Sequence, residues 1–92
     1  MKISLSERFQ SDIISLSDEQ KTQVISVMLK VPKALKQVHQ HSGLGLRKIH
    51  PSGIYEARLG LGLRMIFGIQ SGDLFFHRVG NHDDIQKYLK GL

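Results

Sequence analysis

Apolar residues recur with the spacing of a helix in the first part of the chain and with the spacing of strands in the rest. Residues 2–5 are compatible with a short strand. After them, Phe9, Ile13 and Leu16 follow one another at intervals of four and three residues, which marks one face of an amphipathic helix. The chain is therefore predicted to begin with a strand and a helix.

A second helix is predicted to begin at Asp18. Ser17 and Gln20 form a capping box, in which the serine hydroxyl accepts a hydrogen bond from the backbone and the glutamine side chain reaches back. Pro32 should end or bend this helix, because proline lacks a backbone donor and disfavours the helical conformation in the residue before it. The apolar stripe comprises Val24, Ile25, Met28, Leu29 and Val31, with Leu35 and Val38 beyond the bend. The two helices form a predicted hairpin that extends to about His41.

From Gly43 onward the pattern is one of strands separated by glycine turns. In "IYEARLG" the apolar residues share one face and Glu56 and Arg58 the other, and in "LRMIFGI" Arg64 points away from an apolar face. The segment 60–62 is short enough for a hairpin, since its two glycines can adopt positive φ. "QSGD" predicts a second turn before a third strand, "LFFHRVG".

The third strand has two possible registers. The residues that face the helices are either Phe75, His77 and Val79, or Leu74, Phe76 and Arg78. The second register buries an arginine beneath a helix, which is costly. The first register is therefore favoured, with Arg78 on the open face and His77 nearer the core as a hydrogen-bonded structural histidine.

The expected fold class is α+β, with a small antiparallel β-sheet, an N-terminal helical hairpin packed on one face and a short C-terminal helix. Ninety-two residues form one domain, residues 1–92. A chain of this length buries only about 60 to 65% of the surface that its unfolded form exposes. Its stability should be marginal, which favours a partner that adds burial.

The positive charge of the chain is concentrated after residue 29. The formal net charge is +5, but residues 1–29 hold three Lys and Arg against four Asp and Glu, whereas residues 30–92 hold ten against four. A concentrated basic surface attracts polyanions, so nucleic acid and acidic proteins are the leading classes of partner. A solvated face with lysines for solubility explains the charge alone about equally well.

Glu56, Arg58, Arg64 and Arg78 are all expected on the open face of the sheet. A polar outer face is normal for a half-buried antiparallel sheet. Three arginines on adjacent strands nevertheless repel one another unless an anion compensates, and Glu56 can balance only one of them. The others are suited to phosphate, which arginine binds through its fork of donors.

Several classes of protein are disfavoured. The chain has no cysteine, which excludes disulfides and thiolate metal sites. No apolar run has the length of a membrane span or of a signal peptide core, so a soluble cytoplasmic protein without membrane contacts is expected. His39, His41 and His50 lack the spacing and the further ligands of a metal site, and the glycines do not form a phosphate loop. No metal and no small-molecule cofactor is expected.

Two segments give the chain a resemblance to a known family. "YEARLGLGLRMIF" is similar to the strand, glycine link and arginine-bearing strand of the RelE/ParE superfamily of type II toxin-antitoxin toxins. "FFHRVGNHDDIQKYL" is similar to its terminal strand and to the "VG" turn before a charged residue. The resemblance extends over nearly the whole chain and is closest to the RelE-like branch, which includes ribosome-dependent endoribonucleases that cut messenger RNA. It implies a toxin that inhibits translation, with a small cognate antitoxin, the ribosome and messenger RNA as partners.

The resemblance also assigns candidate catalytic residues. Arg64 matches the family's arginine after the glycine link, and Glu56 and Arg58 fall on the outward positions of the strand before it. His82 matches the charged residue two positions past "VG", and Tyr88 the tyrosine six residues later. Glu56 stands where RelE has a lysine, so the general base stays open. The candidate catalytic set is Arg64, His82, Tyr88, Arg58, Glu56 and Arg78.

The chemistry implied is metal-independent cleavage of RNA, in which the 2′-hydroxyl attacks the adjacent phosphate. This reaction needs a base, cations on the phosphate and an acid for the leaving oxygen. His82 suits the acid because the pKa of imidazole is nearest neutrality, and Tyr88 can stack or donate. Asp83 and Asp84 can keep His82 charged, but a role in capping the terminal helix is favoured.

Further basic residues flank this set and suit contacts with ribosomal RNA. They are Arg47, Lys48, Lys33, Lys36 and Lys87. Solvation alone explains Lys33 and Lys36 nearly as well.

Two classes of function stay open at the level of sequence. The first is the ribosome-dependent endoribonuclease. The second is a ParE-like toxin that binds DNA gyrase or another protein and needs no acid or base, since the same superfamily includes both. Arg64 together with His82 and Tyr88 favours the nuclease. An inactive relative is a third possibility.

Overall fold

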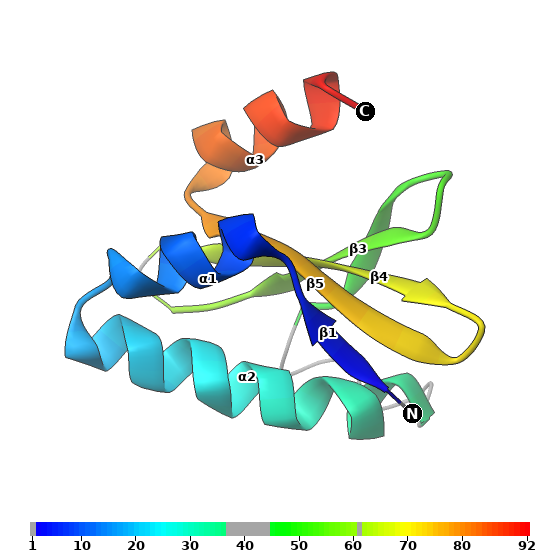
Figure 1. Cartoon of the computed structure of the whole chain (residues 1–92), viewed down its shortest axis with the longest axis horizontal. Coiled ribbons are helices and arrows are strands. Elements are labelled where there is room, and N and C mark those ends of the chain that lie inside the picture. Colours follow the sequence, from blue (N-terminus) through cyan, green and yellow to red (C-terminus); the bar gives the residue numbers. More distant parts are fainter. Residues whose placement is uncertain (1, 37–44, 61) are drawn as a thin grey trace.

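A computed structural model of the protein describes residues 2–36, 45–60 and 62–92 (Figure 1). Its elements, in chain order, are β1 (Ile3–Leu5), α1 (Glu7–Ile14), α2 (Asp18–Lys36), β2 (Arg47–His50), β3 (Ile54–Arg58), β4 (Arg64–Gln70), β5 (Asp73–Gly80) and α3 (His82–Lys90). The predicted α+β class, with an N-terminal helical hairpin packed on one face of the sheet and a short C-terminal helix, is confirmed. The sheet was predicted to be antiparallel and is mixed, because β1 lies parallel to β5.

The five strands of the described ranges form one sheet in the order β1-β5-β4-β3-β2. Neighbouring strands are antiparallel except β1, which lies parallel to β5 and pairs Ile3 with Leu74 and Leu5 with Phe76. The pattern of apolar residues did not predict β2, because its sequence "RKIH" has one apolar residue and no alternation. β2 is held by its pairing with β3, in which Arg47 lies opposite Glu56.

The predicted capping box at the start of α2 is confirmed. The backbone N of Gln20 donates to Ser17 Oγ at 3.2 Å, and the backbone N of Ser17 donates to Gln20 Oε1 at 3.0 Å. Pro32 does not end the helix, because α2 continues to Lys36. Val38 and His41, the predicted end of the hairpin, lie outside the described residues.

The main core lies between the sheet and helices α1 and α2. Phe9 of α1 packs on Phe76 of β5 with ring centroids 5.5 Å apart, and Phe76 lies 5.8 Å from Phe67 of β4. The other buried members of this core are Val24, Val31, Ala34, Ala57, Leu59, Met65, Leu74 and Val79.

A β-bulge decides which side chains of β5 face this core. Phe67 of β4 pairs with Phe76, whereas the preceding residue, Ile66, pairs with Arg78. His77 is left without a partner in β4, so the alternation of the two faces shifts by one residue.

The register favoured from the sequence is therefore wrong for the first half of β5. Leu74 and Phe76 are fully buried on the helix side, and Phe75 is not part of that core. Arg78 lies opposite Ile66 and takes the other face, as expected. His77 also lies on this other face. Contrary to the prediction, it is not a residue of the core beneath α1 and α2. Strict alternation had made the two registers exclusive, and the bulge combines them.

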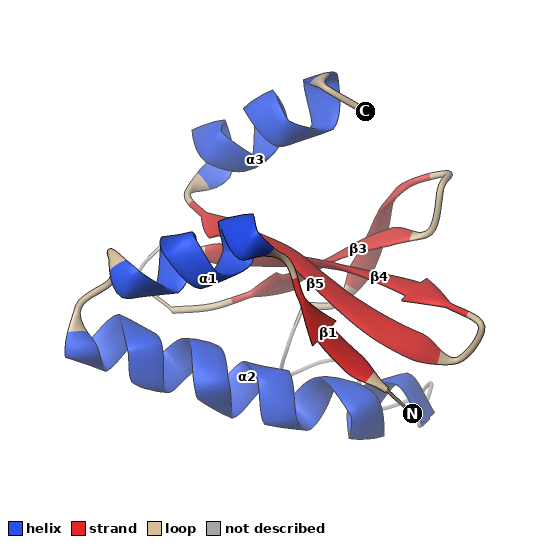
Figure 2. Cartoon of the chain, in the orientation of Figure 1, coloured by secondary structure: helices blue, strands red, loops and turns tan. Residues whose placement is uncertain are grey.

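Helix α3 covers part of the second face of the sheet. Figure 2 shows α2 and α3 on opposite sides of the strands. Ile85 of α3 is fully buried against Ile54 and Ile66, with Tyr88 and Leu89 packed around them. Among the described residues, no helix has the length and apolar character needed to cross a bilayer.

Candidate functional site

A buried carboxylate lies between two arginines on the face of the sheet that carries α3. Glu56, in the middle of β3, is 3% exposed. Arg64, at the start of β4, forms an ion pair with its Oε1, and Nη2 of Arg47 lies 3.6 Å from its Oε2. Strand register explains the cluster, because Arg47 is directly opposite Glu56 on one side and Arg64 is diagonally placed on the other. We call Glu56, Arg64 and Arg47 the Glu56 cluster.

The two arginines of the Glu56 cluster remain accessible to an incoming anion. The side chains of Arg64 and Arg47 are 28% and 62% exposed, whereas that of Glu56 is 4% exposed. One carboxylate cannot neutralise two guanidinium groups, so the cluster carries an excess positive charge. The predicted compensation of one arginine by Glu56 is confirmed.

A hollow of about 350 Å³ lies beside the cluster, between strand β2 and helix α3. The residues that line it are Arg47, Lys48, Ile49, Glu56, Gln86 and Leu89. Arg47 and Lys48, predicted to flank the site, both line this hollow. Lys87 is an exposed residue of the last turn of α3.

Helix α3 begins at His82, which is exposed. Its N-cap is Asn81, whose side chain accepts from the backbone N of Asp84 at 2.9 Å, while Asp84 accepts from the backbone N of Asn81 at 3.0 Å. The predicted capping role is thus confirmed for Asp84, with Asn81 as its partner. Gly80 must be small here, because a Cβ at this position would lie 2.7 Å from that of Asp84.

Tyr88 of α3 stacks on His77 of β5 with ring centroids 6.3 Å apart. Gly68 makes room for the imidazole, since a Cβ there would lie 2.9 Å from His77 Nε2. Burial lowers the pKa of His77 and raises the pKa of Tyr88, against which the positive charge of Arg78 acts in the opposite direction. At neutral pH His77 is therefore uncharged, and Tyr88 retains a proton that it can donate.

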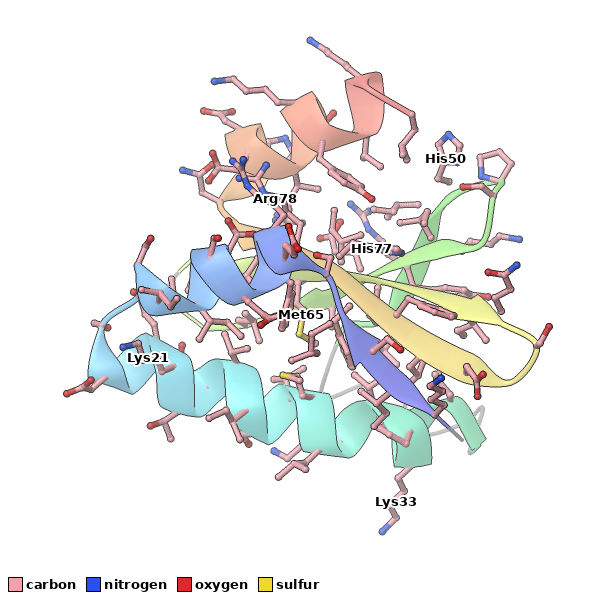
Figure 3. The ribbon with its side chains drawn as sticks, in the orientation of Figure 1. Lys21, Lys33, His50, Met65, His77 and Arg78 are labelled. Carbon is pink, nitrogen blue, oxygen red and sulfur yellow. The ribbon has the colours of Figure 1, made fainter. Side chains whose placement is uncertain are left out.

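Arg78 is paired with a carboxylate, which the sequence did not indicate. Its side chain is 14% exposed, and its Nε donates to Oδ2 of Asp12 in α1 at 3.1 Å. Figure 3 shows it where α1 approaches the start of α3. The same oxygen of Asp12 accepts from the backbone N of Val79 at 3.0 Å.

The other predicted basic residues lie apart from the Glu56 cluster. Arg58 pairs across the sheet with Arg64, but it lines a separate hollow with residues of α2. Lys33 is exposed on α2, on the opposite side of the sheet from α3, and points away from the strands (Figure 3). Lys36 is the last residue of α2.

Among the described residues, no group of three or more histidine, aspartate or glutamate side chains could hold a metal ion. His50 is the last residue of β2, and its Nδ1 is 2.6 Å from Oγ of Ser52 in the following turn. His39 and His41 lie outside the described residues.

Asp12 and Gln86 are site residues that the sequence did not reveal. Both are polar residues of amphipathic helices, and a polar residue on such a helix is normally solvated. Only the path of α1 along β5, and the position of α3 across the hollow from β2, brings them to the site.

No family model and no curated relative matches the sequence. Solved structures match its fold along nearly the whole chain. YafQ from E. coli has a TM-score of 0.74 at 15% identity, over 91% of this chain and 96% of that chain. A chain of the RelB-RelE antitoxin-toxin complex from Methanococcus jannaschii has a TM-score of 0.67 at 16% identity, over 92% and 96% of the two chains.

The E. coli RelBE toxin-antitoxin complex matches as well, with a TM-score of 0.68 at 15% identity, over 87% of this chain and 94% of that chain. At sequence identities this low, the structural matches establish the architecture of the chain alone. The resemblance indicated by the strand motifs is thus confirmed at that level, and the chain has the fold of the RelE and YafQ proteins.

Proposed function

We propose that this protein is the toxin of a type II toxin-antitoxin system and that it cleaves messenger RNA on the ribosome, in the cytoplasm, without a metal ion. The observation that carries the proposal is the Glu56 cluster, in which a buried carboxylate holds two partly exposed arginines beside the β2–α3 hollow. The fold, shared with proteins solved as toxin-antitoxin complexes, supports the same assignment.

The proposed reaction is the attack of the upstream 2′-hydroxyl on the adjacent phosphate. Arg64 and Arg47 supply positive charge that stabilises the crowded phosphate of the transition state. Glu56 is paired at both oxygens, so its main contribution is to hold the two guanidinium groups. His82, exposed at the start of α3, is the candidate acid for the leaving 5′-oxygen.

A small antitoxin is the proposed partner of the free protein. The structures with this fold include complexes of RelE with RelB and of YafQ with DinJ. Residues 30–92 hold ten Lys and Arg against four Asp and Glu. This positive charge favours an acidic segment in the partner.

Cleavage mapping of messenger RNA after brief induction tests the proposal. We expect cuts within translated regions for the parent protein and far fewer for Arg64→Ala. Lys30→Ala removes the same charge from the exposed surface of α2 and should leave the cuts unchanged. Growth arrest without cuts, together with a DNA damage response, would instead indicate a gyrase-directed toxin.

A further inference from the structure

Helix α1 replaces a strand along the part of β5 that β1 does not reach. β1 pairs with β5 only as far as Phe76. Ser6, the N-cap of α1, then donates from its backbone N to Phe76 O at 3.0 Å and from its Oγ to His77 O at 2.9 Å. Two residues further along this edge, the backbone N of Val79 has no strand to bond to, and Asp12 of α1 accepts its hydrogen bond at 3.0 Å.

The oxygen of Asp12 that accepts from Val79 also holds Arg78. Oδ2 accepts from Arg78 Nε at 3.1 Å, in a pair whose side chains are 14% and 11% exposed. Hydrogen bonds between charged groups are stronger than neutral ones, and limited exposure reduces their screening by solvent. Arg8, the other cation beside Asp12, is 66% exposed and 3.5 Å away, so it competes weakly for the carboxylate.

The bond through Nε also fixes where the rest of the guanidinium group acts. Nε is the inner nitrogen of the side chain, so the two terminal nitrogens remain available to another group. Arg78 lies opposite Ile66, which packs with Ile85 and Tyr88 beneath α3, and the neighbouring His77 stacks on Tyr88, so Arg78 lies on the face that carries Tyr88. Consistent with this placement, the charge of Arg78 opposes the effect of burial on the pKa of the Tyr88 phenol. Tyr88 is one of the candidate catalytic residues and belongs to α3, not to α1.

We propose that Asp12 is a positioning residue of the candidate site, which holds Arg78 beside Tyr88 so that the terminal nitrogens of Arg78 face the RNA phosphate. Helix α1, which contributes no other residue to the site described above, thereby determines the position of a third arginine. The proposal rests on the proposed function, because it gives Arg78 a role in cleavage.

A purely structural role for Asp12 is the alternative, since Val79 needs an acceptor in any case. Asp12→Asn separates the two roles. The amide oxygen of asparagine can still accept from the backbone of Val79, whereas the charge that holds Arg78 is lost. Arg78→Lys is the complementary variant. Lysine keeps the positive charge, but it lacks the Nε nitrogen through which Asp12 holds the arginine.

Titration of the Tyr88 phenol tests the geometry without any measurement of cleavage. Tyr55 is the other tyrosine, so Tyr55→Phe makes the ultraviolet titration specific for Tyr88. Loss of the negative charge of Asp12 by itself would lower the pKa of Tyr88, whereas release of Arg78 would raise it. His77, which stacks on Tyr88, is neutral throughout this titration and cannot produce either shift.

We expect Asp12→Asn to shift the titration of Tyr88 upward in the Tyr55→Phe background, as Arg78→Lys and Arg78→Gln should also do. The double variant with Asp12→Asn and Arg78→Gln should shift it no further than Arg78→Gln alone. An unchanged or downward shift in Asp12→Asn would mean that Arg78 keeps its place without Asp12 and would overturn the proposal.

Single-turnover cleavage on saturated ribosomes tests the consequence. Asp12→Asn and Arg78→Gln should each slow cleavage by about tenfold, and the double variant should be no slower than Arg78→Gln, because the two residues act as one unit. An upward titration shift with normal cleavage by Asp12→Asn would overturn the positioning role. If the parent protein cuts no RNA, the proposed function fails, and the titration still decides whether Asp12 places Arg78.

Discussion

Glu56 is the residue that determines the electrostatics of the second face of the sheet. A carboxylate that is 3% exposed is tolerated only because guanidinium groups compensate its charge. The positions of Arg64 and Arg47 are in turn limited to the reach of its two oxygens. A change at any one of the three therefore alters both stability and the site.

Arg64→Ala should lower the free energy of unfolding by about 1–3 kcal/mol, because it leaves the buried Glu56 with the more exposed Arg47 alone. It should also slow messenger RNA cleavage by about 10²-fold, through loss of charge stabilisation at the phosphate. Denaturant unfolding and single-turnover cleavage measure the two effects.

Glu56→Gln combined with Arg64→Ala is the matched control. The neutral amide should restore most of the lost stability, since no buried charge is left unpaired, while cleavage stays slow. Rapid cleavage by a folded Arg64→Ala protein would show that the Glu56 cluster is not the active face.

His82 is exposed at the first position of α3, so its replacement should have little effect on the fold. His82→Ala should bind ribosomes and slow the chemical step by about 10²–10⁴-fold, because proton donation depends on one group whereas binding depends on several cations. His82→Arg should keep part of the activity by charge alone and flatten the alkaline limb of the pH profile, because a general acid acts only in its protonated form. Single-turnover rates from pH 5 to 9 provide the measurement.

Cleavage at the parent rate by both variants on saturated ribosomes would contradict this role. His82 would then have no part in the reaction and would serve only at the start of α3. A change in stability would then be the sole effect.

At the scale of elements, α3 is held on the sheet by an apolar contact and by a stacked ring pair. Ile85 supplies the apolar contact, and His77 and Tyr88 supply the pair. An imidazole beneath a helix is neutral in the folded state and charged in the unfolded state when the pH is low enough. The attachment of α3 is therefore sensitive to pH.

The stability of the protein should fall as the pH drops below the ordinary His77 pKa of 6.5. Because burial lowers the pKa of His77, the unfolded state binds the proton first, and the free energy of unfolding declines until the lowered value is passed. Above pH 6.5 both states are neutral, so this contribution is constant. His77→Gln should flatten the curve, as measured by urea unfolding between pH 5 and 8.

His82→Gln is the control for this experiment, since His82 is an exposed histidine in the same part of the structure. It should leave the slope between pH 5 and 7 as in the parent. An equal slope in parent and His77→Gln would assign the pH dependence to other groups.

Elements defined by local chemistry could be predicted from the sequence, and those defined by partners could not. The capping box at Ser17 and Gln20 and the turn at 70–73 depend on residues close together in the chain. The bulge at His77 depends on β4 and on α3, where Gly68 and Tyr88 accommodate the ring. No alternation pattern contains that information.

The whole molecule combines a small core with a basic surface. Phe9, Phe67 and Phe76 anchor the main core, while Ile14, Ile25 and Leu29 are exposed large apolar residues on α1 and α2. A partner that covers apolar and basic surface would bind the folded state and stabilise it by mass action.

A small acidic antitoxin, encoded next to this gene, should co-purify with the protein from its native host. At a free concentration of 100 times its dissociation constant, the antitoxin should add about 2.7 kcal/mol to the free energy of unfolding. This corresponds to a rise of about 10–20 °C in Tm for a domain of this size. Differential scanning calorimetry of the complex and of the free chain measures the shift. Harmless induction of the free chain, with no acidic partner recovered, would contradict the toxin assignment.

The candidate site was predictable as a set of residues and not as a set of contacts. The family resemblance indicated Arg64, His82 and Tyr88 from motif and order. The pairing of Arg47 with Glu56 requires β2, and that of Asp12 with Arg78 joins residues 66 positions apart. Such pairs form only when the whole chain has folded, so local sequence patterns do not reveal them.

The parallel pairing of β1 with β5 has a consequence for biosynthesis. Ile3 and Leu5 lie beside Leu74 and Phe76, and the N-cap of α1 bonds to residues 76 and 77. Strand β1 is synthesised before β5 and must therefore wait for it before this edge of the sheet can form. Since contacts distant in sequence are slow to form, we expect a nascent chain to lack this edge of the sheet until β5 has left the ribosome.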